Sequence, residues 1–355
     1  MAPDRVLDVR SHALAALRGV AIAAVLLSAL PVLLVSLAHL PVWPAWWWLE
    51  LLHYLPFPVF LGPALIALGA SLLLGRRARG LALLSVLLVL SVVMGLALGR
   101  ADAGSGHLRV MTYNAKAYLA EERPGGFERL VAEVQRHDPD LLVMQDAGEL
   151  TEQRAKAPAS VAPLFDRRSV YTVGQYIIVS RLPLRHCHTQ DITHGVHDQQ
   201  LARCTLTAHG IDIDVVTTHL LSPREGLNAT RRERLQGLDE WRQNFTDRFG
   251  QAQKLAGHIA PRTRPMILAG DLNAPEAAAV MRTLLRTGLR DAFSSAALGY
   301  GYTHGHSLRL GFSFLRIDHV LVSPEIGVAD SFAGGAQASE HRPVIADLLL
   351  RRESH

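Results

Sequence analysis

Five polar residues in the second part of the chain stand just after short apolar segments that have the length of buried strands. They are Asn114, Gln145, Asp146, Asp271 and Asn273, and the segments are Leu108–Met111, Leu141–Met144 and Met266–Ala269. Polar groups at the ends of several strands can meet at one edge of a sheet. Carboxylate and amide oxygens suit hard divalent metal ions and phosphate chemistry. This pattern therefore predicts one site for metal and phosphate.

Two histidines and two further acids extend this set. His219 ends a strand-like segment, and Glu340 and His341 lie in the loop before the last one. A neutral histidine can hydrogen-bond a phosphate oxygen, and a protonated one can stabilise developing negative charge. Asp318, in the string RIDHV, is expected to orient His341 and to favour its charged form.

Each of these residues also has an ordinary structural explanation when it is taken alone. Asp271 and Asn273 can form an Asx turn before the following helix, and Asp146 can cap a helix or a turn. Asp318 can pair with the nearby Arg316. The other histidines match no tetrahedral zinc spacing, so zinc is not expected. The functional interpretation rests on the whole set.

Strands and helices must alternate to position these residues. The strands expected besides those above are Tyr176–Ser180, Leu201–Thr207, Ile211–Thr217, Ile317–Ser323 and Val344–Leu350. The expected helices are Phe127–Val134, Arg231–Phe249 and Glu276–Arg286. About 250 residues is an acceptable length for one α/β domain. We expect a membrane anchor over residues 1–100, a short linker over 101–106 and a catalytic domain over 107–355.

The first hundred residues hold most of the apolar excess of a chain that is 49% hydrophobic. Three segments there lack Asp, Lys and Arg: Val20–Leu37, Leu51–Leu74 and Leu81–Leu98. A helix that crosses the bilayer core needs about 20 apolar residues, so these segments predict three transmembrane helices. A cleaved signal peptide is the alternative for the first segment, but two more segments follow it.

The arginines beside these segments predict which side of the membrane each end faces. They are Arg5, Arg10 and Arg18 before the first segment, and Arg76, Arg77 and Arg79 between the second and third. The intervening loop, Ala38–Glu50, has no Arg or Lys. Positively charged loops stay in the cytoplasm, so three crossings place everything after Arg100 outside it. In that compartment Cys187 and Cys204 can form a disulfide, although two unpaired thiols are equally compatible with the sequence.

The motifs together resemble the endonuclease/exonuclease/phosphatase superfamily. The similar strings run from about Leu108 to Leu350 and are MTYN, PDLLVMQD, IIVSRLPL, TTHL, ILAGDLNA, RIDHVLVS and SEHRPVIADL. The resemblance implies an α/β fold, a four-layer sandwich of two packed sheets flanked by helices. It also implies Mg²⁺- or Mn²⁺-dependent attack of water on a phosphoester.

The resemblance also implies a role for each residue of the set. A first group would hold the metal ion: Asp146, Asn114 and Glu340. A second group would position the attacking water and hold the phosphate: Asp271, Asn273 and His219. His341, paired with Asp318, would stabilise the transition state. The family usually has Glu at the position of Asp146 and Asp at that of Glu340, changes that compensate if both face one ion and otherwise weaken metal binding.

The membrane segments resemble one branch of this superfamily, bacterial phosphatases linked to teicoplanin resistance that act on undecaprenyl pyrophosphate. The string HLLSPREGLNATRRERL fits that branch, and Arg224 would meet the pyrophosphate. The expected substrate is therefore a phosphorylated lipid at the membrane. A nuclease outside the cytoplasm and an inactive binding module are the alternatives. A net charge of only +4 gives little support to nucleic-acid binding.

Overall fold

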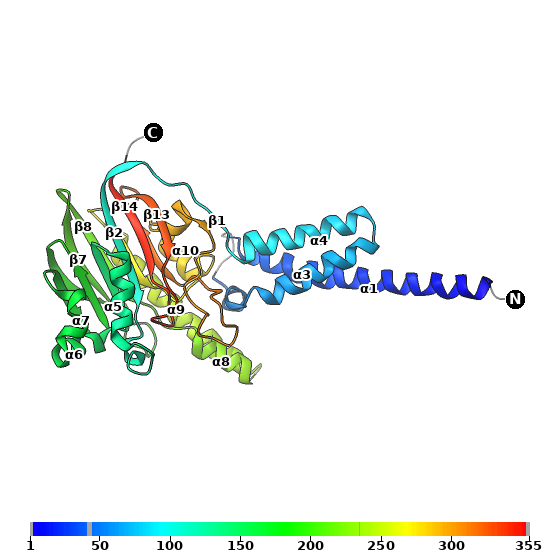
Figure 1. Cartoon of the computed structure of the whole chain (residues 1–355), viewed down its shortest axis with the longest axis horizontal. Helices are drawn as coiled ribbons and strands as arrows, with labels where there is room; N and C mark the ends of the chain where they lie inside the picture. Colours follow the sequence, from blue (N-terminus) through cyan, green and yellow to red (C-terminus); the bar gives the residue numbers. More distant parts are fainter. Residues whose placement is uncertain (1–2, 41–44, 234, 353–355) are drawn as a thin grey trace. The chain divides into compact units, whose positions relative to one another are not determined.

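The apolar first part of the chain is helical in the computed structural model, which describes residues 3–40, 45–233 and 235–352. The chain divides into two units, Met1–Leu96 and Ala97–His355. The first unit, drawn in blue to cyan in Figure 1, consists of α1 (Pro3–Ala38), α2 (Trp47–Glu50), the 3-10 helix η1 (Leu51–Tyr54), α3 (Pro58–Ala70), the 3-10 helix η2 (Ser71–Leu73), α4 (Arg76–Leu88) and the π-helix η3 (Val89–Val93).

Within the described residues, one helix is long and apolar enough to cross a membrane by itself, His12–Ala38 in α1. The second expected span is broken: Trp47–Tyr54 and Pro58–Leu73 meet at an angle of 71°, and they form a span only if the bent pair is counted as one. Pro56 and Pro58 stand at this break, where a proline removes a backbone donor and ends the preceding helix.

The third expected span differs from the prediction at both ends. Its helix begins earlier, at Arg76 in α4, and ends at Val93. The last two residues of the segment, Ala97–Leu98, form strand β1 in the second unit, where they pair with β11 (Leu298–Gly299). Three uninterrupted membrane helices are therefore not found among the described residues.

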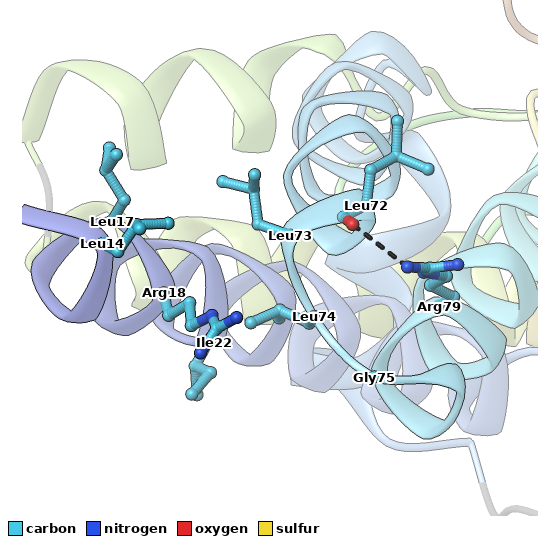
Figure 2. Close-up of a pocket in the computed structure, with 9 residues that line it drawn as sticks. All are labelled: Leu14, Leu17, Arg18, Ile22, Leu72, Leu73, Leu74, Gly75 and Arg79. Carbon is cyan, nitrogen blue, oxygen red and sulfur yellow. Dashed lines mark hydrogen bonds between the residues drawn. The ribbon is translucent and has the colours of Figure 1, made fainter. Parts of the chain in front are cut away.

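A cleft in the first unit is lined by leucines and two arginines (Figure 2). It has a volume of about 630 Å³ and lies between α1 and the segment that joins α3 to α4. Arg79 Nη2 donates a hydrogen bond of 3.1 Å to the carbonyl oxygen of Leu72, which fixes one wall. Arg18 lies on the α1 side of this cleft.

The second unit contains two six-stranded mixed sheets. One has the order β13 (Gly327–Ala333), β14 (Val344–Arg352), β2 (Gly104–Asn114), β3 (Leu141–Gln145), β5 (Tyr176–Ser180) and β4 (Ser169–Val173). The other has the order β10 (Arg290–Asp291), β12 (Asp318–Val322), β9 (Met266–Asp271), β8 (Ile211–His219), β7 (Gln200–Ala208) and β6 (Leu184–Asp191). Each sheet has one parallel pair, β2 with β3 and β8 with β9, and its other neighbours are antiparallel.

The apolar runs form strands that are buried on both faces. Because successive side chains of a strand point to opposite faces, Leu141 and Val143 of β3 pack between the sheets while Leu142 and Met144 pack under helices. Three cores follow: one between the sheets, one under the helices of the first sheet and one under those of the second. The four-layer α/β arrangement that the motifs predicted is confirmed in this unit.

Helices cover the outer face of each sheet. On the first sheet they are α5 (Gly126–His137), α6 (Gly148–Lys156) and α7 (Pro158–Phe165), with the 3-10 turn η4 (Ala117–Leu119). On the second they include α9 (Gly237–Ile259) and α10 (Ala279–Leu285), while α8 (Arg224–Glu233) precedes α9 and α11 (Ala292–Ala296) follows β10.

Some predicted boundaries were wrong. The helix expected over Arg231–Phe249 is two helices, α8 and α9, and α8 packs against α9. Gly237 allows this contact, since a Cβ there would lie 2.2 Å from the carbonyl oxygen of Ala229. The segment expected to be a linker is partly a strand, because β2 begins at Gly104.

Strands β6 and β7 are also joined covalently. Cys187 and Cys204 form a disulfide between them, with a Cα–Cα distance of 4.1 Å. The sequence left this pairing open, and the alternative of two unpaired thiols is therefore wrong. Disulfides persist mainly in oxidising compartments.

Candidate active site

The polar residues that follow the apolar strands meet at one edge of the two sheets. In the parallel pair β2–β3, Asn114 lies beside Gln145, and in the parallel pair β8–β9, His219 lies beside Asp271. Strand β12 runs the other way and begins at Asp318, opposite Asp271. Parallel strands end at the same edge, which is why residues far apart in the sequence come together here.

Asp271 lies at the centre of the site and is 1% exposed. Asn114 Nδ2 donates to Asp271 Oδ2 over 2.9 Å, and the backbone N–H of Asn273 donates to Oδ1, also over 2.9 Å. Burial and the charge of Asp318 raise the pKa of Asp271, although His341 and His219 act in the opposite direction. The carboxylate is thus held rigidly and is more basic than an ordinary aspartate.

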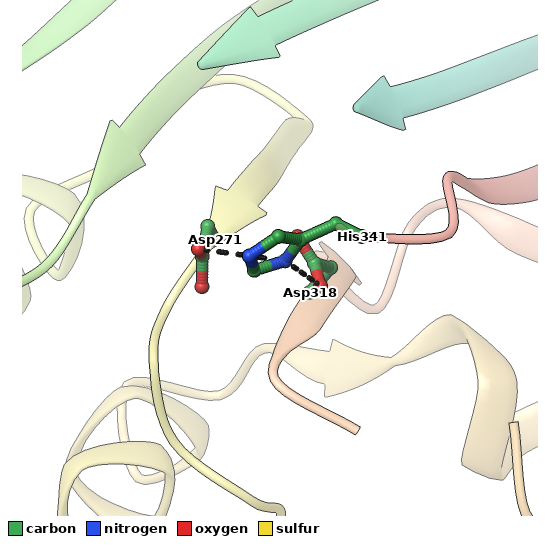
Figure 3. Close-up of side chains that lie close together, drawn as sticks. All are labelled: Asp271, Asp318 and His341. Carbon is green, nitrogen blue, oxygen red and sulfur yellow. Dashed lines mark hydrogen bonds and ion pairs between the residues drawn. The ribbon is translucent and has the colours of Figure 1, made fainter. Parts of the chain in front are cut away.

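His341 bridges Asp271 and Asp318 (Figure 3). Its Nδ1–H donates to Asp318 Oδ2 over 2.9 Å, and Nδ1 is 3.7 Å from Asp271 Oδ2. Burial disfavours the imidazolium, but Asp318 and Asp271 outweigh burial, so the pKa of His341 is raised. For Asp318, the same ion pair overcomes burial and lowers the pKa. The histidine is therefore held in its charged form between two buried carboxylates.

Asp146 lies at the outer side of the site, and its backbone has a positive φ of 47°. Its Oδ2 is 2.7 Å from Lys116 Nζ, and its Oδ1 is 3.4 Å from His219 Nδ1. Burial opposes ionisation of Asp146, but the hydrogen bond and charge of His219 and the ammonium of Lys116 outweigh it and lower the pKa. The carboxylate is ionised and 17% exposed.

His219 is fixed by two adjacent residues at the start of β5. Its Nδ1–H donates to Gln175 Oε1 over 2.8 Å, and its backbone N–H donates to the hydroxyl of Tyr176. The other ring nitrogen, Nε2, is 3.5 Å from Asp271 Oδ2. His219 therefore links the Asp146 side of the site to Asp271.

Lys116 also belongs to the site, although its motif position did not predict it. The residue follows Asn114 by two positions and has φ of 44°, and its side chain is 14% exposed. Asp146 raises the pKa of Lys116 against the effect of burial. The available signal was its rarity, since this is one of three lysines in the chain and it stands directly after a motif strand.

Glu340 and Arg224 form the rim of the site. Arg224 Nη2 is 3.6 Å from Glu340 Oε2, and the two side chains are 54% and 26% exposed. Among the described residues, no hydrogen bond or ion pair joins Glu340 to Asp146. The two expected metal-binding carboxylates are thus each paired with a separate cation.

The side-chain amides of Asn273 and Gln145 form hydrogen bonds within the protein. Asn273 Nδ2 donates to the carbonyl oxygen of Leu220 over 2.8 Å. Gln145 Nε2 donates to the hydroxyls of Thr112 and Thr217, which belong to different sheets. Gln145 therefore ties the two sheets together beside the site.

The sequence profile described as endonuclease/exonuclease/phosphatase family matches residues 111–341, from the strand before Asn114 to His341. The chain belongs to this family. A comparison with curated protein sequences found no match. Family membership makes the protein a metal-dependent hydrolase of phosphoesters, as the motifs predicted.

Solved structures share the fold of this family member. A family protein of Bacteroides thetaiotaomicron has a TM-score of 0.52 and 15% identity, covering 72% of this chain and 100% of its own. One of Bacteroides vulgatus has a TM-score of 0.52 and 18% identity, with coverage of 69% and 99%. A mannosyl-6-phosphatase of Bacteroides thetaiotaomicron has a TM-score of 0.50 and 16% identity, with coverage of 68% and 99%.

Proposed function

We propose that this family member is a membrane-anchored, divalent-metal-dependent phosphatase that hydrolyses a lipid pyrophosphate such as undecaprenyl pyrophosphate. The proposal of hydrolysis rests on Asp271, a buried carboxylate of raised pKa that lies beside the charged His341. A base that can take a proton from water thus stands next to a cation that can neutralise a phosphorane oxygen. Removal of that water proton and stabilisation of negative charge are the two needs of phosphoester hydrolysis.

The remaining polar groups suit the substrate. Lys116, beside Asp146, and Arg224, beside Glu340, would bind phosphate oxygens, Arg224 with two donors of its guanidinium group. Asn114 orients Asp271 through its amide. His219, which lies between Asp146 and Asp271, would donate to a non-bridging phosphate oxygen.

Two sets of donors are candidates for a hard divalent ion. Asp271, Asp318 and His341 have ligand atoms within 4.8 Å of one another, but the Nδ1 proton of His341 is held by Asp318. Asp146 is ionised and partly exposed, and we assign the ion, Mg²⁺ or Mn²⁺, to Asp146 with Asn114 and Glu340. When bound, the ion would polarise the phosphoryl group and neutralise charge on it.

Asp146→Ala should weaken Mn²⁺ binding by at least about 10-fold, because it removes the exposed anionic ligand. His341→Ala should change that affinity by less than about 3-fold. Isothermal titration of the full-length protein in detergent with Mn²⁺ measures both, without any need for turnover. A large loss of Mn²⁺ affinity in His341→Ala with little loss in Asp146→Ala would indicate that the ion binds Asp271, Asp318 and His341 instead.

The charge pattern of the first unit favours a substrate outside the cytoplasm. Arg5, Arg10 and Arg18, in the first half of α1, favour a cytoplasmic N-terminus, so the single span His12–Ala38, or any odd number of crossings, would place the second unit outside. The Cys187–Cys204 disulfide agrees with an oxidising compartment. A lipid pyrophosphate whose headgroup faces outward is the substrate that this placement favours.

Alkaline phosphatase fused after His355 should be active in cells, and a cytoplasmic fluorescent protein fused at the same position should be dark. The reason is that alkaline phosphatase needs oxidised cysteines and such a fluorescent protein fails to mature outside the cytoplasm. A fluorescent fusion with an inactive phosphatase fusion would place the site inside and would favour a cytosolic substrate.

Phosphate release from a panel tests the substrate class. Purified full-length protein is incubated separately with undecaprenyl pyrophosphate, sphingomyelin, an inositol phosphate and plasmid DNA. Phosphate release is measured for the first and third substrates, phosphorylcholine release for sphingomyelin and nicking for plasmid DNA. We expect kcat/KM for the lipid pyrophosphate to exceed that for the others by at least about 10-fold. Preferred cleavage of DNA would support a nuclease instead, and no cleavage of any substrate would support a binding module.

A further inference from the structure

A loop beside the site exposes large apolar side chains. Residues 305–314 contain Leu308, Leu310 and Phe312, which are 42%, 43% and 39% exposed, with Arg309 among them. Single exposed apolar residues are normal on protein surfaces, but three within five residues indicate an interaction surface. We call these ten residues the apolar loop.

The base of the apolar loop is fixed to the catalytic residues. His304, just before it, donates from Nδ1 to the carbonyl oxygen of Glu340 over 3.2 Å, and its ring lies 4.6 Å from that of His341. His306 Nε2 contacts the carbonyl oxygen of Ser339 over 3.0 Å. The base of the loop is therefore joined to the segment that carries His341, which places the loop beside the site.

Helix α8 adds a similar surface next to Glu340. At the start of the helix, Arg224 pairs with the Glu340 carboxylate. Its last turn carries the exposed Arg231 and Arg232, and Leu235 just after it is 82% exposed. Figure 1 shows α8 projecting from the body of the sheets.

We propose that the apolar loop and the turn after α8 insert into the headgroup region of an anionic bilayer and present a lipid phosphate to the site. Leucine and phenylalanine would enter the acyl boundary, and the arginines would pair with lipid phosphates, a combination typical of interfacial segments. A bilayer is favoured over a protein partner because the same chain carries α1, a helix that can span a membrane. This inference rests on the proposed function and extends it to the surface that recognises the lipid.

A fluorescent probe tests the insertion directly. Leu310→Cys is labelled with the environment-sensitive dye NBD under non-reducing conditions, which leave the native disulfide intact, and the full-length protein is placed in phosphatidylglycerol nanodiscs. Arg136→Cys is the matched control. The Arg136 side chain is 70% exposed in the last turn of α5, and α5 leads into the start of β3, which is the end of that strand away from the site. We expect a blue shift and quenching by spin-labelled lipid at position 310 only. Equal, water-like spectra at both positions would overturn the proposal.

Substitution of the loop separates this inference from the proposed function. The triple change Leu308→Ser, Leu310→Ser and Phe312→Ser touches no residue of the catalytic set. We expect kcat/KM for lipid pyrophosphate in nanodiscs to fall by at least about 10-fold while hydrolysis of soluble p-nitrophenyl phosphate stays within about 2-fold. Unchanged lipid hydrolysis would refute the docking surface alone, whereas inactivity of the wild-type protein on both substrates would refute the proposed function.

Discussion

Asp271→Asn should lower metal-dependent phosphate release by about 10²- to 10⁴-fold, the range for loss of a positioned acid or base. Asparagine has the same shape, so packing at this buried position is kept, but the side chain can no longer accept a proton from water. The raised pKa of Asp271 adds to the expected effect, since the lost group is a stronger base than an exposed aspartate. Steady-state phosphate release from the purified variant measures the change.

A matched aspartate separates catalysis from a general charge effect. Asp212, 44% exposed on β8, lies at the end of that strand away from His219, and Asp212→Asn should keep wild-type turnover. Asp271→Asn should also keep Mn²⁺ affinity within about 3-fold, because the ion is assigned to Asp146. Wild-type turnover in Asp271→Asn would remove this residue from the mechanism.

His341→Ala should cost a similar factor of about 10²- to 10⁴-fold, because it removes the cation held beside the reacting phosphoryl group. His209→Ala, in the turn between β7 and β8 at the far edge, is the matched control and should be neutral. Equal activity of the two variants would exclude His341 from catalysis.

The pH dependence gives a second test of His341. Asp318 raises its pKa, and activity requires the protonated ring, so activity should fall as pH rises through this raised pKa. Asp318→Asn removes the anion and lowers the pKa of His341. The alkaline limb of the profile of kcat/KM should therefore move to lower pH in Asp318→Asn. An unmoved limb would assign that limb to another group.

The layers and the edge that holds the site could be predicted from the sequence because both rest on short-range patterns. Apolar runs such as Leu141–Met144 are buried on both faces, and polar residues directly after parallel strands must meet at one edge. Asp271 reaches the site for this reason, whereas Asp318 and His341 reach it because the antiparallel strands β12 and β14 begin at the same edge.

Other features depend on local conformation that composition does not fix. Lys116 reaches Asp146 because residues 116 and 146 both adopt positive φ, which apolar periodicity cannot reveal. Glu340 pairs with Arg224, the first residue of α8, and this contact depends on where α8 starts rather than on apolar periodicity. In the first unit, hydropathy predicted three spans, but it carries no information about the break at Pro56.

Phosphate release from lipid pyrophosphate by the full-length protein decides whether this edge of the sheets is a metal-dependent phosphatase site. It is assayed with Mg²⁺, with EDTA and with Mg²⁺ restored after EDTA. We predict turnover with Mg²⁺, loss of nearly all of it in EDTA and recovery when the ion returns, with Asp271→Asn inactive throughout. Release that is unaffected by EDTA, or equal in the wild type and Asp271→Asn, would contradict a metal-dependent phosphatase site at this edge of the sheets.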